Sequence, residues 1–195
     1  MYPEGTINQF LDDLASESSI PGGGSAAALA GSMTAAVVSF ISNLTIGKKK
    51  YEDVEPEAKE ILKEAEELKK ELVNMVDEDS EILKEILATY KKGDKEKLLT
   101  VSKKAVDFSM EMTKKCVDIM ELSLHISKIG NRMLASDFEV AAFIGDAAVN
   151  SAIANVKINL KSIKDEDYVS RVEDEYSQLR VKSDDLKEEI VEIAN

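Results

Sequence analysis

The sequence predicts an all-α protein, a bundle of about six mostly long helices. Glycine and proline, which interrupt helices most often, number only 9 and 3 in 195 residues. Apolar side chains recur at helical spacing over long stretches, whereas Val, Ile and Thr do not form the short alternating runs typical of strands. The length suits a single helical domain, residues 1–195, with one sizeable core.

Capping patterns and apolar stripes define the first three helices. The first begins at Thr6, where Thr6 and Gln9 have the spacing of a capping box, and its apolar stripe includes Phe10. The second covers about residues 25–46. The third begins near Pro56, because proline suits a first helical position.

Similar signals define the last three helices. The fourth begins near Asp94 and runs to Gly130, a common helix stop. The fifth opens at Ser136 with a second capping box and runs to about Ile163. A last, strongly charged amphipathic helix covers about residues 165–193.

Composition and charge exclude several classes of function. The formal net charge of −13 argues against nucleic-acid binding, which would need a basic stripe. Cys116 is the only cysteine, so we expect no intrachain disulfide and a reducing, cytoplasmic compartment. The uncharged stretch 18–47 is long enough to span a bilayer. Its serines, threonines and proline-glycine start favour instead a buried helix of a soluble protein without a membrane partner.

Two helices carry stripes of small residues that end in asparagine. Small side chains let two helices approach closely, either within one chain or across a dimer interface. The asparagines need partners, because an amide buried without them costs on the order of 1–3 kcal/mol. Capping groups or a flat heterocycle with ring nitrogens and a carbonyl would satisfy them. The second-helix stripe is Ser25, Ala28, Ser32, Ala35, Ser39 and Ser42/Asn43, and the fifth-helix stripe is Ala141, Gly145, Ala148, Ala152, Asn155 and Asn159.

Two aspartates are candidates for acid–base chemistry. Asp79 occupies the apolar stripe of the third helix, where leucine would fit, so its charged form is disfavoured and its pKa should rise. A general acid or base near neutral pH needs that shift. Asp137 stands in the first turn of the fifth helix, where the helix dipole favours an anion without any ligand.

Other reactive residue types give no site. His125, the only histidine, falls on the polar side of the fourth helix and is expected to face solvent. Cys116 has no histidine nearby in the sequence to activate it. No set of Cys and His residues provides metal ligands, so no metal site is predicted.

A glycine triplet precedes the second helix, and a lysine triplet follows it. The glycines fit the spacing G-x-G-x-x-A of dinucleotide-binding loops, but no strand precedes them, and the spacing of a Walker motif also fails. Glycines still allow positive φ angles and expose bare amides at a helix start, where anions bind. The lysines complement the helix dipole and favour the docking of a polyanionic tail. The triplets are Gly22, Gly23 and Gly24, and Lys48, Lys49 and Lys50.

Five motifs in order resemble the formiminotransferase-cyclodeaminase C-terminal domain family over nearly the whole chain. The resemblance implies an all-helical fold that dimerises, a tetrahydrofolate substrate, and neither a metal nor a redox cofactor. The departures are "SEILKEIL" after the acidic motif and a middle helix, "AVDFSMEM", without the usual proline, which leaves the shape of one cleft wall open. The motifs are "PGGGSAAALAGSMTAA", "NLTIGKKKY", "VDEDSE", "GNRMLASD" and "NVKINLKSIKDE".

Two reactions are known in this family, and the resemblance implies one of them. We expect a formiminotetrahydrofolate cyclodeaminase, which forms methenyltetrahydrofolate and releases ammonia. The alternative is a methenyltetrahydrofolate cyclohydrolase, which uses water to interconvert methenyltetrahydrofolate and 10-formyltetrahydrofolate. A third alternative, of another class, is a non-catalytic helical dimer that binds folate or another acidic ligand.

The resemblance also implies which residues form the site. Asp79, Asn131 and Asp137 would line the cleft, and either Asp79 or Asp137 would transfer the proton. Asn155 and Asn159 would hydrogen-bond the pterin. The lysine triplet would meet the carboxylates of the folate tail, with one glutamate or several. A substrate-facing loop, with Asn43 and the lysines near it, would consist of Pro21, Gly22, Gly23, Gly24 and Ser25.

Overall fold

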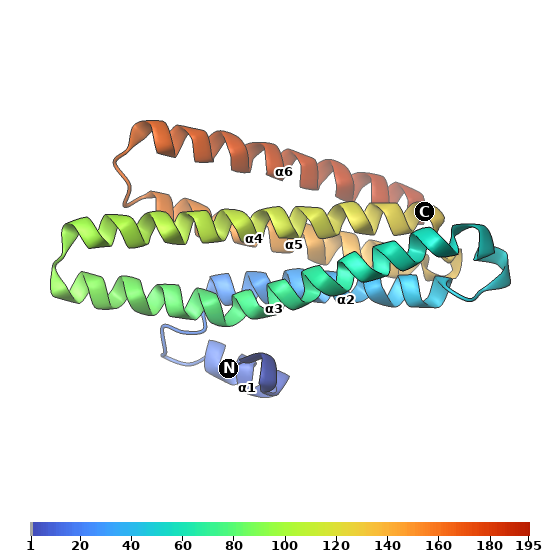
Figure 1. Ribbon diagram of the computed structural model, residues 1–195, viewed down its shortest axis with the longest axis horizontal. Helices are drawn as coiled ribbons and strands as arrows, with labels where there is room; N and C mark the ends of the chain where they lie inside the picture. Colours follow the sequence, from blue (N-terminus) through green and yellow to red (C-terminus); the bar gives the residue numbers. More distant parts are fainter. Residues whose placement is uncertain (1) are drawn as a thin grey trace.

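The computed structural model describes residues 2–195, and these form helices without any strand (Figure 1). The predicted all-α class is therefore confirmed. Short 3-10 helices cover Tyr2–Glu4, Lys49–Val54 and Arg132–Leu134. The α-helices are α1 (Ile7–Leu14), α2 (Gly23–Thr45), α3 (Glu55–Lys92), α4 (Lys95–Ile129), α5 (Ala135–Leu160) and α6 (Glu166–Ala194).

Side-chain caps explain three of the six α-helix starts. Thr6, Asp94 and Asp165 each accept a hydrogen bond from the backbone N–H three residues later, as N-cap residues do. The capping box predicted at Ser136 is wrong, because α5 begins at Ala135 and Ser136 already lies inside its first turn. The Asn131 side chain instead caps the short 3-10 helix that leads into α5.

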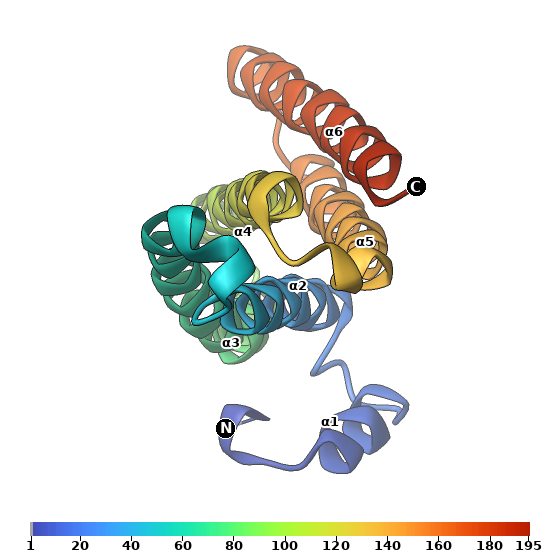
Figure 2. The same cartoon turned by 90° about the vertical axis from the view of Figure 1, so that its right-hand side faces the viewer.

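Three helices, α3, α4 and α5, pack against α2. The helices α3 and α4 form a long antiparallel hairpin, closed at Gly93, whose φ of 71° is easily adopted only by glycine. Seen end-on, α2 lies against α3, α4 and α5, and α6 covers α4 and α5 on the far side from α2 (Figure 2). The short α1 projects away from the bundle beside α2 (Figure 2). The outer sides of α2 and α5 consequently remain uncovered.

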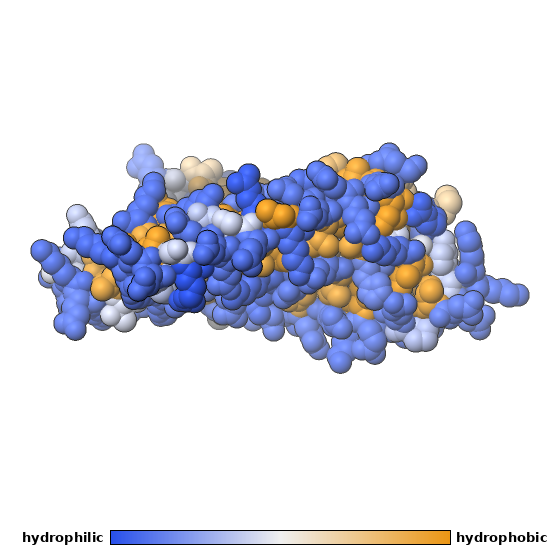
Figure 3. All heavy atoms as spheres, turned by 90° about the horizontal axis from the view of Figure 1, so that it is seen from above, coloured by the Kyte–Doolittle hydropathy of each residue, from blue (hydrophilic) through white to orange (hydrophobic). Residues whose placement is uncertain are grey.

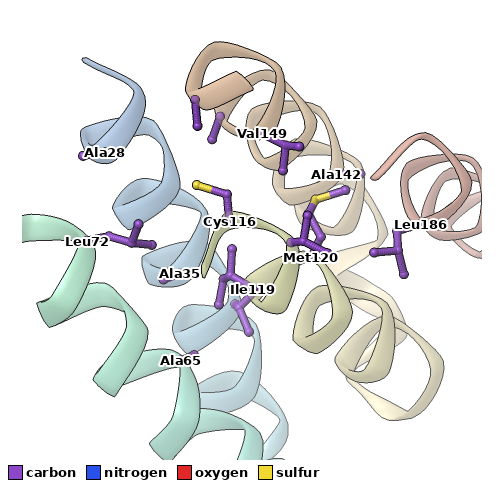
Figure 4. Packing of buried hydrophobic residues seen from close by; sticks show 14 of the residues in the cluster. Ala28, Ala35, Ala65, Leu72, Cys116, Ile119, Met120, Ala142, Val149 and Leu186 are labelled. Carbon is purple, nitrogen blue, oxygen red and sulfur yellow. The ribbon is translucent and has the colours of Figure 1, made fainter. Parts of the chain in front are cut away.

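The stripes of small residues bring helices of the same chain together. A Cβ atom on Gly31 of α2 would lie 2.8 Å from Cys116 Sγ of α4, and one on Gly145 of α5 would lie 2.2 Å from Met120 Sδ. Figure 4 shows Cys116 and Met120 in this closely packed interior. The alanine and serine stripes are therefore explained by packing within one chain, and the alternative that they form a dimer interface is not needed.

The helix α2 is long and apolar enough to cross a membrane by length and composition alone. Core helices of helical bundles have the same properties, and 61% of its most apolar window is buried inside the protein. The structure thus accounts for much of the uncharged sequence of α2 by its packing against α3, α4 and α5.

Candidate active site

A cavity of about 210 Å³ opens at the start of α2, between α3, α4 and α5. It is smaller than the pockets of about 300–1,000 Å³ that enclose typical ligands, so it fits a part of a larger molecule, such as one ring system. The predicted glycines and Asp79, Asn155 and Asn159 meet here, although they come from three helices. The lining residues are Gly22, Gly23, Gly24, Asp79, Ile82, Leu83, Ile86, Ala105, Phe108, Ser109, Asn155, Ile158 and Asn159.

Asp79 is the only ionisable side chain among the lining residues. Burial raises the pKa of this half-buried carboxyl above its usual range, and hydrogen bonding from the Ser25 side chain and backbone opposes part of that rise. Ser25 Oγ lies 2.9 Å from Asp79 Oδ2. The prediction that Asp79 faces a semi-buried space is confirmed, and its pKa is shifted in the direction that a general acid or base requires.

Gly24 is needed because Asp79 lies directly against the start of α2. A Cβ atom on Gly24 would lie only 2.0 Å from Asp79 Oδ1 and 2.5 Å from its Cγ. Any larger residue would therefore displace the carboxylate. Positive φ angles were one of the two expected uses of these glycines, and that expectation is wrong, since among residues 2–195 only Gly47 and Gly93 have positive φ. Close approach, rather than an unusual backbone turn, explains Gly24.

Two amides and a hydroxyl line the cavity together with Asp79. Asn155 Nδ2 donates to the Ser151 carbonyl in its own helix at 2.9 Å, and its Oδ1 lies near Gly23. Asn159 Nδ2 reaches Ser109 Oγ of α4 at 3.4 Å, a long hydrogen bond. Both asparagines are half-buried, so they retain hydrogen-bonding capacity for a ligand in the cavity.

Two residues of the predicted loop do not face the cavity. Pro21 is buried and is absent from the lining, and Ser25 has no exposed surface at all. Neither residue lines the cavity of this chain, so their contact with the substrate stays a prediction. The Ser25 hydroxyl instead donates a hydrogen bond to the Asp79 carboxylate.

The lysine triplet and Asn43 lie at the opposite end of α2 from the cavity. A helix of 23 residues is about 35 Å long, so one chain cannot bring both ends to one small ligand. The expectation that Asn43 and the lysines lie near the glycine loop is wrong within a single chain. All four side chains are exposed to solvent, and these residues are Asn43, Lys48, Lys49 and Lys50.

Asn131 and Asp137 also lie at the lysine end, so neither lines the cavity of its own chain. Asn131 has a structural role: its Nδ2 donates to the Leu44 carbonyl at 3.2 Å, and its Oδ1 accepts from the Met133 N–H at 3.1 Å. Asp137 is half-buried in the first turn of α5, where the helix dipole explains an acidic residue.

The apolar residues and the α4 residues that close the cavity were not predicted from the sequence. Ile82 and Phe108 form the wall between α3 and α4, and Ser109 contributes the only hydroxyl among the lining residues. Ser109 is a serine on a buried helix face, and that pattern was a usable signal.

Cys116 and His125 are not part of this site. Burial raises the pKa of the Cys116 thiol to about 12, so it stays protonated and unreactive. His125 is exposed at the surface, and its Nε2 contacts Glu57 Oε1, which links α4 to α3. Among residues 2–195, no group of three or more His, Cys, Asp or Glu side chains is arranged to hold a metal ion.

A larger groove of about 1030 Å³ between α3 and α4 suits an anionic ligand poorly. Five carboxylate side chains line it against three lysines, and each of those lysines already pairs with a carboxylate. The small cavity at Asp79 therefore remains the better candidate for an active site.

Comparisons with known proteins agree on one family. The model of the family described as formiminotransferase-cyclodeaminase matches residues 6–178. Methenyltetrahydrofolate cyclohydrolase from Methylorubrum extorquens is 36% identical over 96% of this chain and 94% of its own. Formimidoyltransferase-cyclodeaminase from Gallus gallus is 29% identical over 83% of this chain, which covers 32% of that longer relative.

A solved structure gives the same result. The crystal structure of formiminotetrahydrofolate cyclodeaminase from Thermotoga maritima superposes with a TM-score of 0.95 at 27% sequence identity. The match covers 99% of this chain and 97% of that chain.

Proposed function

Because this chain belongs to the formiminotransferase-cyclodeaminase family, we propose that it is a folate enzyme that opens or closes the one-carbon bridge of methenyltetrahydrofolate. The single observation that carries this proposal is Asp79, the only ionisable side chain in a small cavity with glycine and asparagine walls. Such a cavity fits the ring system of a folate, and a carboxyl with a raised pKa supplies the proton transfer.

We place the cyclohydrolase first and the cyclodeaminase second. The relative with 36% identity over nearly its whole length is a methenyltetrahydrofolate cyclohydrolase. This reverses the order that the motifs favoured. The cyclodeaminase keeps its place because the solved structure with a TM-score of 0.95 is a formiminotetrahydrofolate cyclodeaminase.

In the cyclohydrolase reaction, Asp79 acts first as a base and then as an acid. Water adds to the methenyl carbon, and the ionised Asp79 takes one proton from that water. The carbon becomes tetrahedral and carries a hydroxyl. The bond to one folate nitrogen then breaks, its electron pair stays on that nitrogen, and the nitrogen receives the proton from Asp79. Loss of the hydroxyl proton to solvent leaves a formyl group on the other nitrogen.

The cyclodeaminase reaction needs the same two steps from Asp79. The second folate nitrogen attacks the formimino carbon, and Asp79 takes the proton from that nitrogen. The proton passes to the imino nitrogen, which also takes one from solvent. Ammonia then leaves with its electron pair, and the methenyl cation remains. One carboxyl therefore serves both reactions.

Absorbance of the methenyl chromophore separates these functions. The purified protein is given methenyltetrahydrofolate and, separately, formiminotetrahydrofolate. With methenyltetrahydrofolate we expect the absorbance to fall faster than it does without the protein, as a cyclohydrolase would cause. A gain with the second marks the cyclodeaminase. No change with either substrate, while folate binding persists, would instead identify a non-catalytic folate-binding dimer.

The site residues that the family resemblance predicts lie at both ends of α2, and antiparallel pairing of two copies would bring them together. We therefore include this homodimer in the proposal. The outer sides of α2 and α5, which Figure 2 shows uncovered, expose large apolar side chains. The face over α6 is mostly hydrophilic, with scattered apolar patches (Figure 3). Antiparallel pairing of the α2–α5 faces would bring the lysine end of one copy to the cavity of the other. The exposed apolar residues are Met33, Phe40, Val140, Phe143 and Ile158.

Phe143→Asp is expected to give a monomer with activity reduced at least tenfold. The Phe143 side chain is 55% exposed in the isolated chain, and a carboxylate in its place would be buried unpaired in the dimer. Sedimentation velocity measures the association state. Val181→Asp on α6, at a side chain 60% exposed, is the matched control and should remain a dimer. A dimeric, fully active Phe143→Asp variant would contradict this interface.

We further propose a folate enzyme of the cytoplasm that needs no cofactor. Proton transfer at a tetrahedral carbon requires neither a metal nor a redox cofactor. The lysine triplet would meet the glutamate tail of the folate, whether it has one glutamate or several, from the partner copy. A single, buried cysteine suits the cytoplasm, and we include no membrane partner.

A further inference from the structure

The Ser25 hydroxyl lies among three hydrogen-bonding groups but has only one proton to donate. Ser25 Oγ is 2.9 Å from the Val76 carbonyl oxygen, 2.9 Å from Asp79 Oδ2 and 3.4 Å from Ser80 Oγ. A hydroxyl is one donor with two acceptor lone pairs. It therefore cannot donate to the carbonyl and to the carboxylate at the same time.

The two protonation states of Asp79 use this hydroxyl differently. When Asp79 is ionised, the Ser25 O–H donates to Oδ2 in a charge-assisted hydrogen bond. When Asp79 is protonated, its own O–H donates to Ser25 Oγ, and the Ser25 proton turns to the Val76 carbonyl. Rotation about one C–O bond thus keeps Asp79 bonded in both states, and no heavy atom has to move.

We propose that Ser25 is a positioning residue that holds Asp79 in one place through both halves of proton transfer by turning its single proton between Asp79 and Val76. Its catalytic consequence rests on the proposed function. Ser25 has no exposed surface, so it acts through Asp79 and not on the substrate. Gly24 permits the arrangement, because it lets Asp79 lie directly against Ser25.

No other charged side chain lines the cavity and could shift the pKa of Asp79. The lining residues from α2, α4 and α5 are all uncharged. On α3 itself, Glu78 and Glu81 are exposed to solvent, and half-buried Asp77 accepts a hydrogen bond from the Tyr2 N–H. Burial raises the pKa of Asp79, and the Ser25 hydroxyl is the first opposing contribution. Removing the hydroxyl should therefore be visible in the titration of Asp79.

Ser25→Ala tests the inference by direct titration. Carbon-13 NMR follows the Asp79 carboxyl in the ligand-free protein, with Asp79→Asn to assign the signal. A charge-assisted hydrogen bond is stronger than a neutral one, so we expect the pKa of Asp79 to rise by about one unit. The acidic limb of the kcat–pH profile should move to higher pH by the same amount. Ser80→Ala, which leaves the Ser25–Asp79 contact intact, should change neither.

The outcomes separate this inference from the proposed function. An unchanged pKa of Asp79 in Ser25→Ala, with turnover of the folate substrates intact in the wild type, would overturn the role of Ser25 alone. A raised pKa with no turnover of either folate by the wild type would uphold the Ser25–Asp79 coupling and reject the function. Ser25→Cys, which keeps a side chain of similar shape but replaces the hydroxyl with a weakly donating thiol, serves instead if Ser25→Ala does not fold.

Discussion

Gly24→Ala is expected to lower kcat/KM by about 100-fold, because misplacing a catalytic group by about 1 Å costs that much. The added methyl would lie 2.0, 2.5 and 2.8 Å from Asp79 Oδ1, Cγ and Oδ2, so the whole carboxylate must move. The fold should persist, since alanine is the better helix former by about 1 kcal/mol. Steady-state kinetics on methenyltetrahydrofolate and thermal unfolding of the same sample measure the two effects.

Gly23→Ala is the matched comparison for Gly24→Ala. It makes the same chemical change one residue earlier, but its methyl would lie 3.8 Å from Asn155 Oδ1, in ordinary van der Waals contact. We expect a loss smaller than tenfold, in contrast to Gly24→Ala. Equal losses in both variants would show that the close approach of Asp79 to α2 is not what matters.

Asp79→Asn is expected to lower kcat by about 10²–10⁴-fold, the range that general acid–base catalysis contributes. The amide has nearly the same shape as the carboxyl and can still hydrogen-bond Ser25, but it cannot exchange a proton with the substrate. Glu78→Gln, one residue earlier on the exposed side of α3, is the control and should retain full activity. Asp137→Asn, at the far end of α5, should lose less than tenfold.

Asp79→Asn should leave the protein at least as stable as the wild type at neutral pH. Burial raises the pKa of Asp79 in the folded state, so the folded protein binds this proton more tightly than the unfolded chain does. Stability from this group is therefore full below the unfolded pKa and falls as the pH rises through the folded pKa. Asp79→Asn removes that penalty, so urea unfolding at pH 7 should show an unchanged or higher midpoint. A large loss of stability would mean that Asp79 has a structural role.

The fold was predictable because its signals are local. The Thr6 cap forms where the sequence predicts it, and α4 and α6 begin directly after Asp94 and Asp165, close to their expected starts. The Ser136 pattern misled because serine and glutamate three residues apart also occur inside a first turn, and here the chain enters α5 through a 3-10 helix capped by Asn131. A capping box alone does not distinguish these two cases.

The site was predictable only in part because it depends on distance in space. Asp79 was recognisable as a charge on an apolar stripe, and the cavity brings it together with Asn155 and the glycines. The close contact of Gly24 with Asp79 joins positions 55 residues apart, and no local pattern indicates it. The lysine triplet was placed near the glycine loop, but the length of α2 separates them in one chain.

A crystal structure of Asp79→Asn soaked with methenyltetrahydrofolate tests most directly whether this cavity is the active site. The variant should bind substrate without converting it. We predict that the methenyl carbon lies within one water molecule of the residue 79 side chain, and that the pterin lies against Asn155 and Asn159. Folate bound with its methenyl carbon away from residue 79, at the lysine end or in the larger α3–α4 groove, would contradict this assignment.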